Sequence, residues 1–589
     1  MGSTKAVENG DGFVSISGNW EKRRIETTNR LGSIDRRTFM KLSGAGAAAL
    51  IFGTGPFTER VVAAPSFSGY PFKLGVASGD PLPDGVVLWT RLAPEPLAED
   101  GRGGMPQESV AVRWQVAADE NFGRIVRWGT VNAQPELAHS VHVEVGGLRP
   151  HRPYFYRFKA GSEISPVGKT KTTPTLGATI PRMRFSFASC QMYEHGYYTA
   201  YWHMAQEDLD LVVHLGDYIY EYGPNEYVAL TGNVRTHNGP KIFSLPEYRN
   251  RHALYRRDRD LRAAHAAFPW VVTWDDHEVQ NNYTDELPEG ELTTEEFLQR
   301  RAAAYQAYYE HMPLRRSSVP KGPDMLLYRR LTYGNLAEFN VLDTRQYRDD
   351  QAAGGGLDPP NPEQQGPSRT ITGEAQERWL LDGLAGSGAR WNVLAQQVFF
   401  AQRDFGVGDD QLLSMDAWDG YLGSRNRILG FIAERNISNP VVITGDVHNN
   451  WAADLKIDFN DPGSPKVGTE FVGTSISSGG DGADTDLRAL SIVAENPHIK
   501  FFNGQRGYVR CILSPESFQA DYRVLPYVSQ RGAPIHTRAS FVAVDGQPGA
   551  QQVSGDPISG TARASHAIES DPERLAAQRR ADRGSRSSR

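Results

Sequence analysis

The side chains best suited to bind a metal ion follow four short apolar segments of the chain. They are Cys190, Asp217, Asp276, His277, Asp446 and His448. In α/β sheets, ligands bind at the carboxyl ends of the strands. We therefore expect these clusters to converge in space, although they lie far apart in the sequence.

The convergence of acidic and thiol groups predicts a bound cation. Buried carboxylates repel one another unless a positive charge compensates them. A mixture of sulfur, oxygen and nitrogen donors is typical of a metal site. Asp217 and Tyr220 are three residues apart, so one tight turn can direct both at the same centre. Asp446 and His448 are two apart and can face one site from a loop or an extended segment.

Each of these residues also has an ordinary structural interpretation. Cys190 can be a small buried apolar residue, and Asp217 can form a turn or cap a helix. His448 can be a hydrogen-bonded histidine of the core. The recurrence of such residues after successive apolar segments favours a shared site over these separate roles.

Short apolar segments alternate with helical patterns from residue 181 onwards, which predicts an α/β domain over 181–545. The expected strands are 183–188, 209–214, 270–274, 337–342, 391–395 and 441–444. The expected helices are 196–208, 246–266, 293–312, 374–385 and 423–435. The many arginines between Glu247 and His265 are expected on a solvated helix face.

The parts of the chain on either side of this domain differ in character. Residues 68–175 alternate in a strand-like pattern, which predicts a small β-sandwich of the immunoglobulin-like type. Beyond residue 545 the apolar pattern fades, and 546–589 are expected to form a disordered tail.

The first 64 residues have the layout of an export signal. Arg36-Arg37, followed by an uncharged stretch rich in glycine and alanine, resembles a twin-arginine signal. We therefore expect a secreted, cell-surface or periplasmic protein that uses the twin-arginine export machinery. No run is long and apolar enough to predict a membrane-spanning helix in the mature chain.

The composition excludes several classes of protein. With two cysteines in 589 residues, a disulfide scaffold and a cysteine-based zinc module are excluded. The net charge of −7 argues against a nucleic-acid-binding module. Because Cys190 is a candidate ligand and Cys511 stands in a strand-like segment, we predict that the two form no disulfide.

An ordered set of motifs resembles the PhoD-type alkaline phosphatases, which belong to the metallophosphoesterase superfamily. The motifs are Ser-Cys-Gln at 189–191, Gly-Asp-Tyr-Ile-Tyr-Glu at 216–221, Trp-Asp-Asp-His-Glu at 274–278, Leu-Asp-Thr-Arg-Gln-Tyr at 342–347 and Gly-Asp-Val-His at 445–448. Residues 74–81 and 88–91 resemble the start of the N-terminal β domain of that family. The resemblance covers about residues 70–545, and the twin-arginine signal agrees with it.

The resemblance implies a metallophosphoesterase-like catalytic domain that contains one Fe³⁺ and Ca²⁺. The residues that match the iron ligands are Cys190, Asp217, Tyr220 and His448. Asp217 would bridge to calcium, with Asp276, Asp446 and Asn282 as further oxygen ligands. Thiolate and phenolate suit Fe³⁺, and hard oxygen ligands suit Ca²⁺.

The implied activity is the hydrolysis of phosphate esters by attack of a metal-held oxide or hydroxide on phosphorus. Arg345 would bind a phosphate oxygen, or alternatively pair with a nearby acid. His277 would protonate the leaving group or bond the phosphate, or alternatively orient a ligand.

Two other functions remain open at this point. The same metal centre could serve a phosphodiesterase, including an enzyme that acts as a phospholipase D does. A secreted binding protein without enzymatic activity would require the four strand-end clusters to be coincidental. The sequence contains neither a phosphate-binding loop with Gly-Lys-Ser/Thr nor a Gly-x-Ser-x-Gly motif.

Overall fold

A computed structural model describes residues 67–556 of the chain. The predicted export signal over 1–64 lies outside the described residues, as does the part of the predicted tail after residue 556. The tail prediction begins too early. Residues 547–554 form an ordered strand that pairs with the strand before it, because their backbone completes the edge of a sheet.

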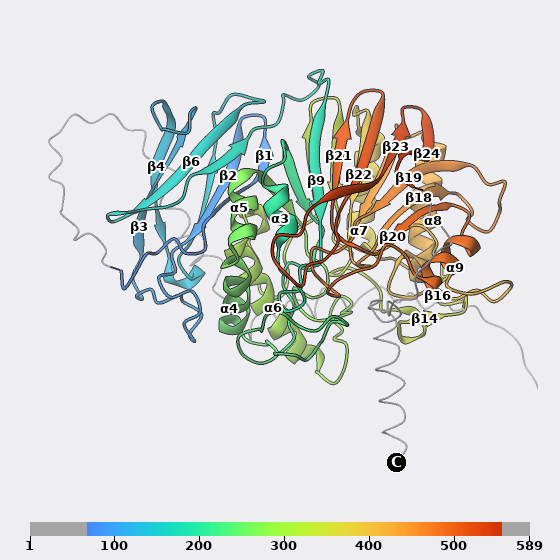
Figure 1. Cartoon of the computed structure of the whole chain (residues 1–589), viewed down its shortest axis with the longest axis horizontal. Coiled ribbons are helices and arrows are strands. Elements are labelled where there is room, and N and C mark those ends of the chain that lie inside the picture. The colour runs from blue at the N-terminus through green and yellow to red at the C-terminus, as the bar shows by residue number, and fades with distance from the viewer. Residues whose placement is uncertain (1–66, 557–589) are drawn as a thin grey trace, which may run out of the picture. The chain divides into compact units, whose positions relative to one another are not determined.

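The largest sheet has ten strands and contains both N-terminal and C-terminal parts of the chain (Figure 1). In order across the sheet they are β24 (Gln547–Ser554), β23 (His536–Val544), β22 (Ser517–Leu525), β21 (Arg506–Leu513), β9 (Met183–Ala188), β10 (Leu211–His214), β11 (Pro269–Val272), β1 (Val76–Leu82), β2 (Gly85–Arg91) and β5 (Ser140–Val145). The four strands β9, β10, β11 and β1 are parallel, whereas the outer strands are antiparallel. The carboxyl ends of the four parallel strands therefore lie at the same edge of the sheet.

A second sheet has seven strands. They are β12 (Arg329–Tyr333), β13 (Ala337–Val341), β15 (Trp391–Ala395), β17 (Pro440–Thr444), β19 (Lys466–Val472), β18 (Asn450–Lys456) and β20 (Ile499–Asn503). Strands β13, β15, β17 and β19 are parallel. The six strands expected from the apolar segments are all present, and β9 and β15 have the predicted bounds.

The β-rich N-terminal part contributes to two sheets. Strands β1, β2 and β5 extend the ten-stranded sheet, so this segment shares a sheet with the α/β part of the chain. The other strands form a separate sheet of β4 (Ile125–Ala133), β3 (Val110–Ala117), β6 (Pro153–Ala160), β7 (Glu163–Ile164) and β8 (Gly168–Lys171). Strands β14 (Leu357–Asp358) and β16 (Leu413–Ser414) pair with each other.

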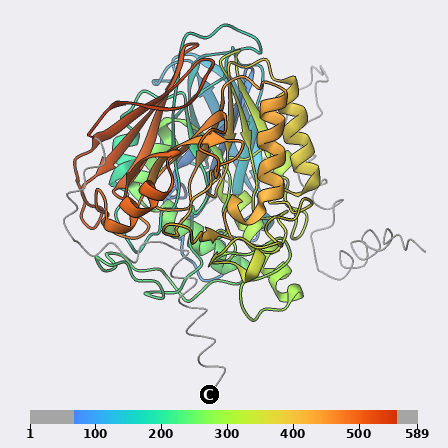
Figure 2. The same cartoon turned by 90° about the vertical axis from the view of Figure 1, so that its right-hand side faces the viewer.

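Helices cover the outer faces of the two large sheets. They are α3 (Thr199–Met204), α4 (Leu245–Arg256), α5 (Arg259–Ala267), α6 (Thr294–His311), α7 (Gly373–Gly386), α8 (Leu422–Glu434) and α9 (Leu487–Glu495). One apolar core joins α3 to α6 with the ten-stranded sheet, and another joins α7 to α9 with the seven-stranded sheet. Helices α7 and α8, yellow and orange, lie side by side in Figure 2. A third core fills the space between the sheets, so the α/β part has four layers.

The segment 246–266 forms two helices rather than the one expected. Asp258 separates α4 from α5. Its side chain accepts hydrogen bonds from the N–H groups of Asp260 and Leu261, so it caps the start of α5. The prediction of a solvated arginine face holds for Arg257 and Arg259, which are exposed, but not for the arginines of α4 before them. Arg249 and Arg251 are buried, and they bind the Glu310 carboxylate and the Tyr222 carbonyl respectively.

Candidate metal centre

The predicted site residues come together where the carboxyl ends of the parallel strands of both large sheets meet. Strands β9, β10 and β11 provide one side, and β13 and β17 provide the other. The Thr273 hydroxyl donates to the Leu342 carbonyl at 2.9 Å, and Gln397 Nε2 donates to both groups. These bonds join the strand ends of one sheet to those of the other.

Sharp turns after the strands direct the candidate ligands toward the centre. Cys190, Asp217, Asp446 and His448 all have positive φ, between 56° and 62°. This left-handed backbone is uncommon for residues with a side chain and occurs often at functional sites. Gly216 is also required, since a Cβ there would lie 2.5 Å from the Asp275 nitrogen.

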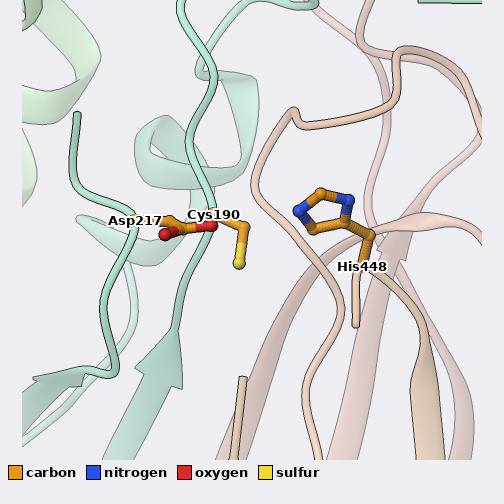
Figure 3. Close-up of side chains that lie close together, drawn as sticks. All are labelled: Cys190, Asp217 and His448. Atoms are coloured by element: carbon orange, nitrogen blue, oxygen red, sulfur yellow. The ribbon is translucent and has the colours of Figure 1, made fainter. Parts of the chain in front are cut away.

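Two overlapping groups of side chains could hold metal ions. In the first, the ligand atoms of Cys190, Asp217 and His448 all lie within 4.8 Å of one another, and Figure 3 shows these side chains around a common space. In the second, Asp217 is shared with Asp276 and His277 at the same spacing. All five residues are buried. Asp217 thus belongs to both groups, and the family resemblance implies a bridging role for this residue.

Tyr220 lies at the first group. Its hydroxyl donates to Asp217 Oδ2 at 2.8 Å and lies 3.3 Å from His448 Nε2. It also lies 2.7 Å from Ser478 Oγ. The spacing of Asp217 and Tyr220 in the sequence therefore does bring both side chains to one place.

Asp446 and Asn282 lie at the edge of the second group. Asp446 Oδ1 is 4.0 Å from Arg345 Nη2, and Asp276 Oδ1 is 3.9 Å from the same nitrogen. Asn282 contacts the group through its backbone, because its N–H donates to Asp276 Oδ2 at 2.6 Å.

Arg345 is fully buried and pairs with acids, which was one of its two expected roles. Its Nε donates to Asp275 Oδ1 at 2.5 Å, and its Nη1 donates to Asp416 Oδ1 at 2.8 Å. The Nη2 group has no hydrogen-bond partner among residues 67–556. This nitrogen is the one that lies toward Asp276 and Asp446.

Burial and mutual repulsion disfavour the charged forms of the acidic ligands. Burial, reinforced by neighbouring carboxylates, raises the pKa of the Cys190 thiol and the pKa of Asp446 well above their usual values. The pKa of Asp217 is also raised by burial, against the opposing effect of His277. Burial lowers the pKa of His448, which favours the neutral imidazole that binds metals.

His277 has the opposite electrostatic environment. Burial alone would lower its pKa, but the carboxylates of Asp276 and Glu221 outweigh burial and raise the pKa well above its usual value. Its Nδ1 lies 2.8 Å from Glu221 Oε2, which fixes the orientation of the ring. Because Nδ1 is held by Glu221, the other ring nitrogen, Nε2, is available to a different partner.

The donor set fits a cation. Asp217 Oδ1 is buried and has no hydrogen-bond partner in the described part of the chain. Thiol, phenol, imidazole and carboxylate groups surround it, and a multivalent ion would satisfy that oxygen and offset the repulsion.

Three residues that support the site have no role predicted from the sequence. The Glu278 carboxylate accepts hydrogen bonds from the N–H groups of Asp217 at 3.1 Å and Asp275 at 2.8 Å, and so ties two ligand loops together. Glu221 binds His277, and Asp416 binds Arg345. Glu278 and Glu221 stand inside the quoted motifs, whereas no pattern around Asp416 singles it out.

Comparisons with known proteins identify the class. The family described as PhoD-like phosphatase matches residues 185–522, and its N-terminal domain matches 59–174. The chain belongs to the PhoD-like phosphatase family and is a phosphoric ester hydrolase.

Two individual relatives are particularly similar. The chain is 59% identical over 557 residues to alkaline phosphatase D of Bacillus subtilis (strain 168), which covers 94% of this chain and 95% of the relative. A solved structure described as "Structure of PhoD" is 63% identical and has a TM-score of 0.82, covering 84% of this chain and 95% of that one. Among the described residues, no helix is long and apolar enough to cross a membrane.

Proposed function

We propose that the chain hydrolyses phosphate esters at a mixed centre of Fe³⁺ and Ca²⁺. The convergence of Cys190, Asp217, Tyr220 and His448 supports this proposal. Thiolate and phenolate donors favour Fe³⁺, and Asp217 also belongs to the oxygen-rich second group. Asp276, Asp446 and Asn282 are the proposed calcium ligands, because Ca²⁺ prefers oxygen donors.

The bound cations would neutralise phosphate charge and lower the pKa of a bound water, so that no serine or cysteine nucleophile is required. Cys190 is proposed to be a metal ligand and not the nucleophile, since its thiol lies among the other candidate ligands. The side chains around the ions then have the tasks of binding the phosphate and moving protons.

Arg345 is proposed to bind a phosphate oxygen through Nη2. Asp275 and Asp416 occupy its other nitrogens and fix the plane of the guanidinium. An arginine that is already oriented loses little conformational freedom when it binds an oxyanion. His277, oriented by Glu221, is proposed to give a proton from Nε2 to the leaving oxygen.

The chain is also proposed to be exported by the twin-arginine machinery and to act outside the cytoplasm. The Arg36-Arg37 motif and the uncharged segment that follows support this proposal. Replacing both arginines by lysine is expected to retain the protein in the cytoplasm. Equal amounts of the variant and of the unmodified protein outside the cell would contradict it.

The experiment that tests the proposed activity combines substrates with one substitution. Phosphate release or ester cleavage is measured on an aryl phosphate, its diester and phosphatidylcholine, each with Asp217→Asn and with Asp382→Asn as the control at an exposed position. Asp217→Asn is expected to lose bound metal and most of the rate, because one ligand to both groups is weakened. Unchanged metal content and turnover in Asp217→Asn would mean that Asp217 only forms a turn or a cap and does not bind metal.

A further inference from the structure

An arginine-rich pocket shares no residue with the metal centre. A cavity of about 270 Å³ is lined by Tyr193, Arg235, Arg257, Asp258, Arg259 and Arg531, and we call it the arginine pocket. Asp260 contacts two of these arginines. Four guanidinium groups against two carboxylates leave a formal charge of +2, although the chain as a whole carries −7. The pocket is therefore a local concentration of positive charge.

Arg235 forms a rigid wall of the pocket. Its Nε donates to the Tyr193 carbonyl at 2.7 Å, and its Nη1 pairs with Asp258 Oδ2 at 2.8 Å. The guanidinium also lies over the rings of Tyr193 and Tyr198, at 3.9 and 4.3 Å. Since Asp258 additionally caps α5, its carboxylate is fully occupied by the protein. Neither residue needs a ligand to be ordered.

The other three arginines retain unused hydrogen-bond donors. Arg259 and Arg531 each contact the single carboxylate of Asp260, at 3.2 and 3.3 Å. The Arg257 side chain makes no hydrogen bond or ion pair within residues 67–556. Arg531 also lies 4.5 Å above the ring of Tyr197, which limits its movement. A guanidinium carries five N–H donors, so most donors of this trio face the cavity or solvent.

We propose that the arginine pocket binds a phosphate group at a site separate from the reaction centre. A tetrahedral dianion would balance the charge of +2, and its oxygens can each accept from a different guanidinium. A carboxylate would balance half of that charge and offer two oxygens. One water occupies about 30 Å³, so the cavity has room for such an oxyanion together with several waters.

One residue of the pocket is near the candidate metal centre along the chain. Tyr193 follows the candidate ligand Cys190 by three residues, so their Cα atoms are at most about 11 Å apart. The phosphate in the pocket is thus either free phosphate or a second, unreacting phosphate of an extended ester. The second source rests on the proposed function, whereas binding of free phosphate does not.

The test uses the metal-loaded full chain with the double substitution Arg257→Gln and Arg531→Gln. Both side chains are exposed, so the fold should tolerate their loss. Arg378→Gln is the matched control, because Arg378 is an exposed arginine on α7. Calorimetric titration measures the binding of inorganic phosphate. Kinetics compare alkyl monophosphates with alkanediol bisphosphates of increasing length.

Two results support the proposal and identify the source. Free phosphate is supported as the ligand if one phosphate-binding event of the wild type becomes at least about tenfold weaker, or disappears, in the double variant. A lower KM for bisphosphates than for monophosphates that disappears in the double variant, with kcat unchanged, supports a substrate phosphate. Identical titrations and identical KM values in the double variant and the wild type would overturn the proposal. Absence of any ester hydrolysis would refute the proposed function, and the titration would still decide whether the pocket binds phosphate.

Discussion

Replacing Glu278 by glutamine would test whether one buried carboxylate holds the two ligand loops together. Its Oε2 accepts from the N–H groups of Asp217 and Asp275, and its Oε1 accepts from Tyr218. The glutamine amide has one acceptor oxygen, so one or two of these backbone N–H groups lose their partner. An unsatisfied buried donor costs about 1–3 kcal/mol.

The expected loss of stability is about 2–4 kcal/mol, because one or two such donors are left unpaired. A difference of that size raises the unfolded fraction about 30- to 1,000-fold. Bound metal should also be lost, because the backbone at Asp217 is no longer fixed. Burial raises the pKa of Glu278 to about 8. The comparison is therefore made near pH 9.5, where the wild-type residue is the carboxylate.

The assay is urea unfolding at fixed metal concentration, together with the metal content of the purified variant. Glu120→Gln is the control, because Glu120 is exposed. An unchanged unfolding midpoint and unchanged metal content in Glu278→Gln would show that this carboxylate does not stabilise the ligand loops. That result would mean that the ligand loops keep their shape without this carboxylate.

Chelating calcium is expected to abolish phosphatase activity and to lower Tm, and activity that persists in protein shown to be free of calcium would contradict the calcium assignment. Burial lowers the pKa of His142 to about 4. The unfolded chain therefore binds more protons between about pH 6.5 and 4, and stability should decrease as the pH falls across that window, by up to about 1.4 kcal/mol per unit from this residue. His142→Gln should make the pH dependence of unfolding shallower, and an unchanged slope would exclude this contribution. Titration of denatured, metal-free, unreduced protein should find two thiols, because Cys190 and Cys511 are both free; a smaller number would contradict that.

The location of the site could be predicted from the sequence because the necessary signals are local. A short apolar run identifies a buried strand, and β9 and β15 have the predicted bounds. The polar residue after such a run lies at the end of the strand, so the residue order alone was enough to place Cys190 and Asp217 at strand ends. The proximity of Asp217 and Tyr220 is predicted from another local signal, because one tight turn can direct both side chains at the same centre.

The pairing of strands is not a local property, and it could not be predicted in the same way. The ligand loops come from two sheets, with β9, β10 and β11 in one and β17 in the other. The C-terminal strands β22 to β24 complete the ten-stranded sheet, although the tail was expected to begin at residue 546. Which strands pair depends on contacts between distant segments.

The supporting charges were missed for a similar reason. Arginines are usually exposed, so the segment 247–265 favoured a solvated face. Arg249 is instead buried because Glu310, on another helix, pairs with it. Asp416 likewise gains its importance from Arg345, Arg348 and Gln351, which lie far from it in the sequence.

We predict that Cys190 and Tyr220 hold a ferric ion at the site of hydrolysis. The most direct measurement is elemental analysis of active protein together with its visible absorption spectrum. We predict stoichiometric iron and a visible charge-transfer band that Tyr220→Phe shifts or abolishes, because phenolate and thiolate donate charge to Fe³⁺. Fully active protein that is colourless and contains no iron would contradict the assignment of Cys190 and Tyr220 as ferric ligands.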